Sequence, residues 1–317
     1  MADLAAHLST RAHGPRGGDA YRWLAALTVA ATIVLIGVGS IVRTSGSGLG
    51  CPDWPLCHGQ VLPPLERTAI IEWSHRTVAA LTGAMILATA AWTWFRHRDD
   101  RVRTAASIAV VPLLAIQAGL GREAVVRELP PSVVATHLLT GMLLLAAIVV
   151  MATPRTALAA PADAARDALR GHVRIALAAA ALTVTLGAVM TAEGAAYACT
   201  SWPGCAEAGL PWQGTGLHLL HWLHRGATLL ALLAAVNLAM RAHRLALPAS
   251  TMRVAADTVL GLYAVQALLG AANVLWQPGS ARVAHLVVAA IIWAVLVSLA
   301  ARGCRHLAPH SEVPREA

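Results

Sequence analysis

The sequence predicts an all-α integral membrane protein with eight transmembrane helices, arranged as two tandem four-helix bundles in a parallel repeat. Three observations lead to this fold class. Only 13% of the 317 residues are charged, against roughly 25% in an ordinary soluble domain, and the mean hydropathy is +0.61. Eight apolar stretches have the length of about 20 residues that crosses a bilayer. Several motifs also recur at a spacing of 148 or 149 residues.

The apolar stretches define the predicted helices in chain order. They cover residues 22–43, 67–95, 104–121, 132–152, 172–191, 216–240, 253–272 and 281–301. The first stretch follows several arginines and could be taken for a secretory signal. Its length and its copy in the second half favour a spanning helix instead.

The arginines orient these helices. All 24 Lys and Arg residues are Arg, the formal net charge is +8, and 17 of the 24 fall in the two tails or in the even-numbered connections. The positive-inside rule therefore places the N- and C-termini in the cytoplasm and the odd-numbered connections, of which the first and third in chain order carry paired cysteines, on the outer or periplasmic side. We expect a multi-pass protein of the cell membrane. The charge follows from topology, so no nucleic acid partner is predicted.

The repeat divides the chain into two halves. Four matches keep their order: Cys51 to Cys57 with Cys199 to Cys205, Glu72 to Arg76 with His221 to Arg225, Gln117 with Gln266, and His137 with His285. Each half has an even number of helices, so both copies enter the membrane in the same direction. The predicted domains are a tail 1–21, a first bundle 22–152, a linker 153–171, a second bundle 172–301 and a tail 302–317.

Four histidines lie inside predicted spans: His75, His137, His224 and His285. Ionisable residues are rare there and indicate function. A single histidine could equally well bond between helices, but four at repeat-related positions favour a common role. Two histidines per half cannot complete a four-ligand zinc site, whereas two facing imidazoles suit a haem iron. We therefore predict one haem in each half, with one ligand per helix and both haems near the outer side.

The residues around these histidines differ between the halves. Arg76 and Arg225 each follow a histidine and are predicted to face haem propionates, or alternatively to extend towards the membrane interface. Glu72 precedes His75 by three residues and shares its helix face. A carboxylate at this depth costs about 2.5–3.5 kcal/mol, and the second half has His221 instead, to which the sequence assigns no role. We infer that Glu72 is catalytic, the alternative being an ion pair with Arg76.

The cysteines of the outer connections lie where disulfides persist. The pairs Cys51–Cys57 and Cys199–Cys205 are predicted to be bonded. They would either staple a short loop or act as a redox-active relay, since exposed short-loop disulfides can be labile.

The stretches Val42 to Leu49, Cys51 to Cys57 and Glu72 to Arg76, together with the motif His221 to Arg225, resemble haem A synthases. With the two later histidines, the resemblance spans residues 22–301. It implies two four-helix bundles and an oxidoreductase acting on a CH3 group, which oxidises the C8 methyl of haem O to a formyl group and so supplies haem A for cytochrome oxidase.

The resemblance also implies roles for individual residues. His75 and His137 would bind the iron of the substrate haem O, and His224 and His285 the iron of a haem B cofactor. Glu72 would be the catalytic carboxylate, and Cys51 with Cys57 matches the cysteine pair of the family's outer loop.

Two other functions fit the histidines. A quinol-linked diheme cytochrome b would hold two permanent haem B groups without needing Glu72. A haem transporter or chaperone would hold an exchangeable haem and leave the porphyrin unchanged. Expected partners of the enzyme are membrane lipid, a quinone or another electron acceptor, haem O synthase and cytochrome oxidase assembly factors. The sequence leaves a homo-oligomer open.

Overall fold

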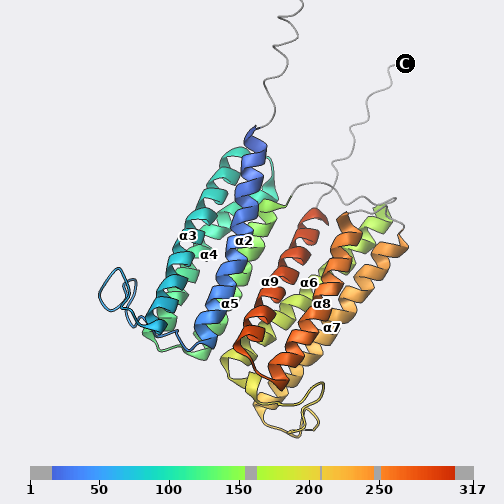
Figure 1. Cartoon of the computed structure of the whole chain (residues 1–317). Coiled ribbons are helices and arrows are strands. Elements are labelled where there is room, and N and C mark those ends of the chain that lie inside the picture. The colour runs from blue at the N-terminus through green and yellow to red at the C-terminus, as the bar shows by residue number, and fades with distance from the viewer. Residues whose placement is uncertain (1–15, 154–162, 208, 246–250, 304–317) are drawn as a thin grey trace, which may run out of the picture.

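Long helices dominate the computed structural model, which describes residues 16–153, 163–207, 209–245 and 251–303 (Figure 1). These residues form eight α-helices and one short 3-10 helix, η1, at Ala195–Tyr197. The α-helices are α2 Arg16–Thr44, α3 Arg67–Arg96, α4 Arg101–Val126, α5 Pro131–Ala152, α6 Asp163–Ala192, α7 Gly216–Arg244, α8 Thr251–Leu275 and α9 Gly279–Gly303. All eight are long and apolar enough to cross a membrane, so the predicted fold class is confirmed.

The helices extend beyond the apolar stretches that predict them, and α6 does so most. It begins at Asp163, inside the segment 153–171 that is predicted as a linker. The reason is local composition, because this segment is rich in Ala, Arg and Leu, which are among the best helix formers. Charged residues exclude this segment from the bilayer core, but they allow a spanning helix to continue through it into water. Residues 154–162 of the predicted linker lie outside the described residues.

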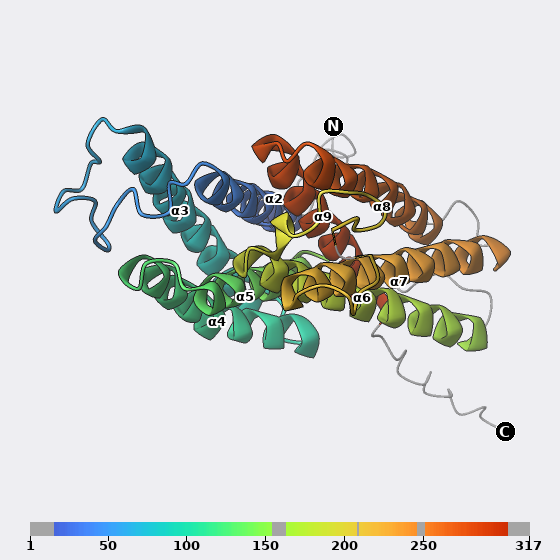
Figure 2. The same cartoon turned by 90° about the horizontal axis from the view of Figure 1, so that it is seen from below.

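The helices form two four-membered rings that lie side by side (Figures 1 and 2). In the first ring α2 packs on α3, α3 on α4, α4 on α5 and α5 on α2; α6 to α9 follow the same order in the second. Consequently α3 and α5 face each other across the first ring, and α7 and α9 across the second. This arrangement is compatible with the predicted tandem repeat.

The two rings meet along α5 and α9, with α2 and α6 beside them. Met142 and Leu145 of α5 pack on Ala290 and Ala294 of α9 in one buried cluster. The indole of Trp293 in this seam donates to the carbonyl of Met142 at 2.9 Å. Small residues let spanning helices approach closely, which explains the alanines at the contact.

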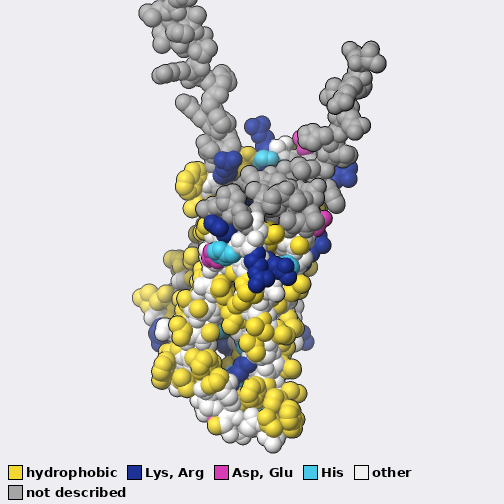
Figure 3. All heavy atoms as spheres, turned by 90° about the vertical axis from the view of Figure 1, so that its right-hand side faces the viewer, with side chains coloured by type: hydrophobic (Ala, Val, Ile, Leu, Met, Phe, Trp, Pro, Cys, Tyr) yellow, Lys and Arg dark blue, Asp and Glu magenta, His cyan; other side chains and the backbone are white. Residues whose placement is uncertain are grey.

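The described ends of the chain lie at one end of the molecule, and the connections from α2 to α3 and from α6 to α7 lie at the other (Figure 1). On the face in Figure 3, basic side chains gather mainly towards the end with the termini, and the belt below is mostly hydrophobic. Helices α3, α5, α7 and α9 all start at the end with the cysteine connections. Their first turns therefore set the depth of the predicted site residues.

Candidate haem sites

The four spanning histidines occupy matching places in their helices. His75 is the ninth residue of α3 and His224 the ninth of α7, while His137 is the seventh of α5 and His285 the seventh of α9. At 1.5 Å per residue, all four lie about 9–12 Å along helices that start at the same end. Since α3 faces α5 and α7 faces α9, each ring of helices has two histidines at similar depth on opposite sides.

The four imidazoles share the state of one ring nitrogen. The Nδ1 atom is buried without a hydrogen-bond partner in all four histidines. An orphaned Nδ1 against a neighbouring helix leaves Nε2 as the atom that can bind iron. This donor set fits a haem with two axial histidines.

A glutamine distinguishes the two pairs. In the first ring the Gln117 side-chain amide lies 3.3 Å from Nε2 of His137. Oε1 is buried without a partner in both Gln117 and the matching Gln266 of the second ring, and among the described residues no side-chain hydrogen bond joins Gln266 to His285. The sequence shows these glutamines as a repeat match but not as neighbours of the histidines.

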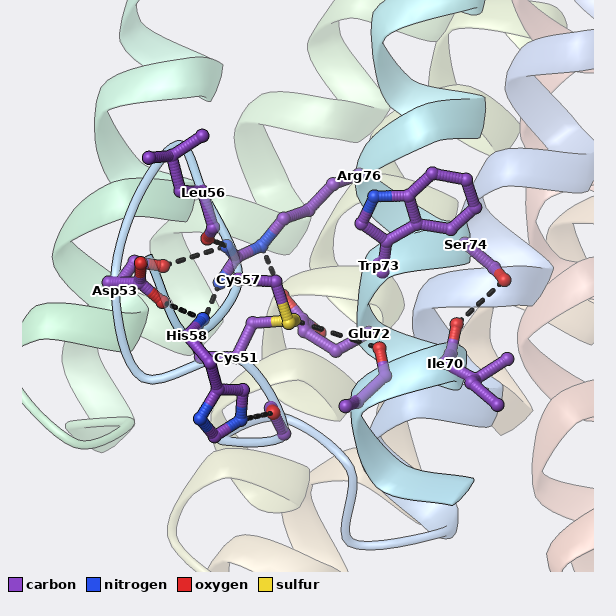
Figure 4. Close-up of a disulfide and its surroundings, with 12 residues drawn as sticks. Cys51, Asp53, Leu56, Cys57, His58, Ile70, Glu72, Trp73, Ser74 and Arg76 are labelled. Carbon is purple, nitrogen blue, oxygen red and sulfur yellow. Dashed lines mark hydrogen bonds and ion pairs between the residues drawn. A yellow bond between two sulfur atoms is a disulfide. The ribbon is translucent and has the colours of Figure 1, made fainter. Parts of the chain in front are cut away.

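Arg76 connects helix α3 to the first cysteine loop (Figure 4). Its Nη1 donates to the carbonyls of Asp53 and Leu56, each at 2.7 Å, and its Nη2 donates to the carbonyl of Cys51 at 2.8 Å. Its Nε donates to Oε1 of Glu72 at 3.0 Å. The guanidinium thus holds the loop against the helix, and the predicted contact with a haem propionate stays a prediction.

Glu72 is buried, with 5% of its surface exposed. The ion pair with Arg76, the alternative considered for this residue, is present. Its other oxygen, Oε2, accepts no hydrogen bond from the described residues. The pair therefore balances the charge of Glu72 but leaves one carboxylate oxygen free to take a proton.

The second half keeps the arginine and replaces the carboxylate. Arg225 donates through Nη1 to the carbonyl of Pro203 at 2.7 Å and to that of Gly204, and through Nη2 to the carbonyl of Ser201 at 3.0 Å. His221, also buried, places Nδ1 at 3.2 Å from the carbonyl of Ala195. Loop anchoring therefore depends on the arginine and does not require an acid one turn before it.

Both predicted disulfides are present, Cys51–Cys57 and Cys199–Cys205. Each packs against the tryptophan that precedes a candidate ligand histidine by two residues, Trp73 in one half and Trp222 in the other. The disulfide loops thus rest on the same helical turns that carry the histidines.

A polar residue closes each cysteine loop. Asp53 accepts from the backbone N–H groups of His58 at 2.6 Å and Gly59 at 2.8 Å. The bond from Gly59 is the main reason that the pKa of Asp53 lies below its ordinary value. At the matching place in the second loop, Ser201 accepts from the N–H of Ala206 at 2.6 Å.

One other group of metal-ligating side chains comes together within the described residues: Cys199, Cys205 and Glu207. Its two sulfurs form a disulfide, and metal binding needs the thiolate. We therefore assign it no metal, and the histidine pairs remain the candidate iron sites.

Comparison with known proteins gives a consistent result. The sequence profile of the COX15-CtaA family, described as cytochrome oxidase assembly protein, matches residues 22–297. A relative from Bacillus licheniformis named "Heme A synthase" is 32% identical over 68% of this chain and 73% of its own length. Proteins of the same name from Symbiobacterium thermophilum and Shewanella oneidensis are 32% and 27% identical, covering 78% and 87% of this chain and 84% and 94% of theirs.

Proposed function

The chain belongs to the COX15-CtaA family of cytochrome oxidase assembly proteins, and from this premise we propose that it is a haem A synthase. It is an oxidoreductase that acts on haem O and supplies haem A for cytochrome oxidase. The observation that carries the proposal is that two pairs of facing histidines lie at one depth, and that a buried carboxylate lies beside the pair of the first bundle but not beside the pair of the second.

The first bundle is the reactive one. His75 and His137 bind the iron of haem O, and Glu72 lies on the same face of α3 as His75, three residues earlier. Arg225 holds its loop beside His221 as Arg76 does beside Glu72, so the scaffold does not explain an acid at this position. A buried carboxylate that the scaffold does not need is a candidate for chemistry.

The second bundle holds the cofactor. His224 and His285 fit haem B, because both Nδ1 atoms are buried and both Nε2 atoms remain for the iron. When bound there, haem B supplies a one-electron redox centre. His224 and His285 would hold the iron of that centre, and the residues of this bundle would fix its position.

The reaction converts the C8 methyl to a formyl group in two stages. Two-electron oxidation, with water as the oxygen source, gives an alcohol, and a second gives a hydrated aldehyde that loses water. In total one water is consumed and four electrons and four protons leave, the electrons passing to an acceptor such as a membrane quinone. Glu72 Oε2 takes a proton from the methyl carbon or from the attacking water, as a positioned general base. Arg76 holds that carboxylate in place.

The orientation of the protein follows from its arginines. We infer that both termini are cytoplasmic and that the cysteine loops and the haem sites lie towards the outer side of the cell membrane. Electrons are therefore released near the outer leaflet, where lipid-soluble acceptors are available.

The function is tested by replacing Glu72 with Gln in protein supplied with haem O. We expect the rate of haem A formation to fall by about 10²–10⁴-fold, the usual contribution of a general base. Both histidine pairs should still bind haem. His221→Gln is the matched control at the repeat position and should retain most activity. Haem A at the normal rate in Glu72→Gln would overturn the proposed role of Glu72.

A further inference from the structure

Each of the four candidate ligand histidines packs the edge of its ring against a glycine of a neighbouring helix. We define these glycines as the seat glycines: Gly39 on α2, Gly121 on α4, Gly187 on α6 and Gly270 on α8. In every case the nearest ring atom is Cε1, which lies between the two ring nitrogens. Gly39 faces His75, Gly121 faces His137, Gly187 faces His224 and Gly270 faces His285.

The contact leaves little or no room for a side chain. A Cβ added at Gly187 would lie 2.9 Å from Cε1 and 3.3 Å from Nδ1 of His224. The corresponding distances to Cε1 are 3.2 Å at Gly39, 3.3 Å at Gly121 and 3.5 Å at Gly270. Ordinary contact between carbon atoms begins at about 3.5 Å, so a methyl group at the first three positions would push the ring away.

The seat glycines follow the repeat. Gly39 and Gly187 are 148 residues apart, and Gly121 and Gly270 are 149 apart, which are the spacings of the cysteines and of the ligand histidines. None of the four has a positive φ angle. Their backbone conformation is therefore open to any residue, and glycine in a helix interior is unfavourable. The absence of a Cβ is therefore the property that explains glycine at these four positions.

We propose that the seat glycines are positioning residues for the haem-ligating imidazoles. With no Cβ in the way, the Cε1 edge of each ring lies against the neighbouring helix and its Nδ1 is buried, so the glycine fixes the position and the plane of the ring that offers Nε2 to the iron. The inference rests on the proposed function, because it assumes that the four histidines bind haem. It adds the elements that fix the rings, namely α2 and α4 in the first bundle and α6 and α8 in the second.

The second bundle offers the sharpest test, because its haem stays bound during purification if it is a cofactor. Gly187→Ala is compared with Gly261→Ala in full-length protein purified from membranes supplied with haem B. Gly261 lies on α8 and has nothing within 4 Å of an added Cβ. Both variants exchange a helical glycine for the better helix former alanine, so a purely structural effect on the helix is the same in both.

For Gly187→Ala we expect haem binding to weaken by about tenfold, the lower end of what loss of a ligand-orienting group costs. The electron paramagnetic resonance signal of the remaining low-spin haem should shift, because the plane of the His224 ring changes. Gly261→Ala should match the parent in haem content and spectrum. The melting temperature of the haem-free protein, measured by circular dichroism, should not fall in either variant.

The distances from an added Cβ to the imidazole ring predict effects of graded size. The effect on haem binding should decrease from Gly187 to Gly39 and Gly121, and should be smallest at Gly270. For the first bundle, haemin added to the purified protein serves as the probe, with Gly119→Ala on α4 as control, since nothing lies within 4 Å there.

The outcomes separate the two proposals. A parent protein without a low-spin haem signal would overturn the ligand assignment itself. A parent with that signal, and a Gly187→Ala variant equal to Gly261→Ala in haem content and spectrum, would overturn the positioning role and leave the proposed function standing.

Discussion

The two bundles differ at a few positions on a common scaffold. Each has facing histidines, a disulfide loop and an arginine that holds the loop carbonyls. They differ where Glu72 is replaced by His221, and where the Gln117 side-chain amide lies within hydrogen-bond distance of its histidine. Under the proposed function, the shared residues build a haem site and the unshared ones decide which chemistry takes place in it.

A sequence difference lies beside the Gln117 amide. Gly141 on α5 lies opposite this amide, and a Cβ there would lie 3.3 Å from its Nε2. The matching residue of α9 is Ala289. A methyl group at position 141 would therefore crowd the amide beside His137, and the second bundle has a methyl group at the matching position.

The largest expected effect separates the bundles by their haems. His285→Ala should remove the haem that stays bound through purification, with a loss of at least about 100-fold in affinity because an iron ligand is gone. His137→Ala should keep that haem and lose haem A formation. Haem content and product are both measured by extraction and chromatography. Loss of the resident haem in His137→Ala but not in His285→Ala would mean that the roles of the bundles are exchanged.

Removal of an anchor arginine should have the next largest effect. Arg76→Gln leaves three carbonyls of the first loop without their donor, at a cost of roughly 2–4 kcal/mol, and it also releases Glu72. We expect faster proteolysis of the first loop together with loss of activity. Arg225→Gln should expose the second loop to the same degree, with a smaller loss of activity. Equal activity losses in both variants would show that Glu72 does not depend on Arg76.

A smaller change makes the first bundle resemble the second. Gly141→Ala should displace the Gln117 amide from His137, so that the iron no longer competes with a hydrogen bond for Nε2. One such bond is worth about 0.5–1.5 kcal/mol, and haemin should bind the first bundle about 2–10-fold more tightly. A haemin titration measures this. Unchanged or weaker binding would show that the amide does not compete for His137.

The smallest effect concerns pH and distinguishes the loops. Hydrogen bonds from Gly59 and His58 lower the pKa of Asp53 below its ordinary value of 3.8. A carboxylate with a lowered pKa stabilises the folded loop above its unfolded pKa and loses that effect as the pH falls through the folded value. The first loop should therefore loosen in acid at a pH below 3.8, as measured by proteolysis, and Asp53→Asn should be loose already at neutral pH. An acid transition that Asp53→Asn retains would assign it to another group.

Much of this arrangement can be predicted from the sequence, because it depends on periodicity and spacing. The spans follow from hydropathy, the pairing of cysteines from their positions in matching loops, and the common depth of His75 and His224 from the repeat. The partners of Arg76 cannot be predicted in this way. They depend on where the loop carbonyls lie after Asp53 and the disulfide have closed the loop.

The seat glycines show a second limit. Gly121 and Gly270 stand out as repeat matches, and Gly39 and Gly187 could be found by the same spacing. That each faces a histidine depends on how neighbouring helices are rotated, which a single sequence does not specify. The start of α6 at Asp163 differs from the prediction for a simpler reason, because the charged residues that exclude a segment from the bilayer core do not prevent it from forming a helix.

The central claim is that the first bundle changes the porphyrin while the second only holds one. Haem extraction, chromatography and mass spectrometry of the purified full-length protein, expressed with a supply of haem O, test it most directly. The account predicts haem A together with bound haem B. Haem B alone, at two per chain with haem O untouched, would contradict it and make the protein an electron-carrying cytochrome.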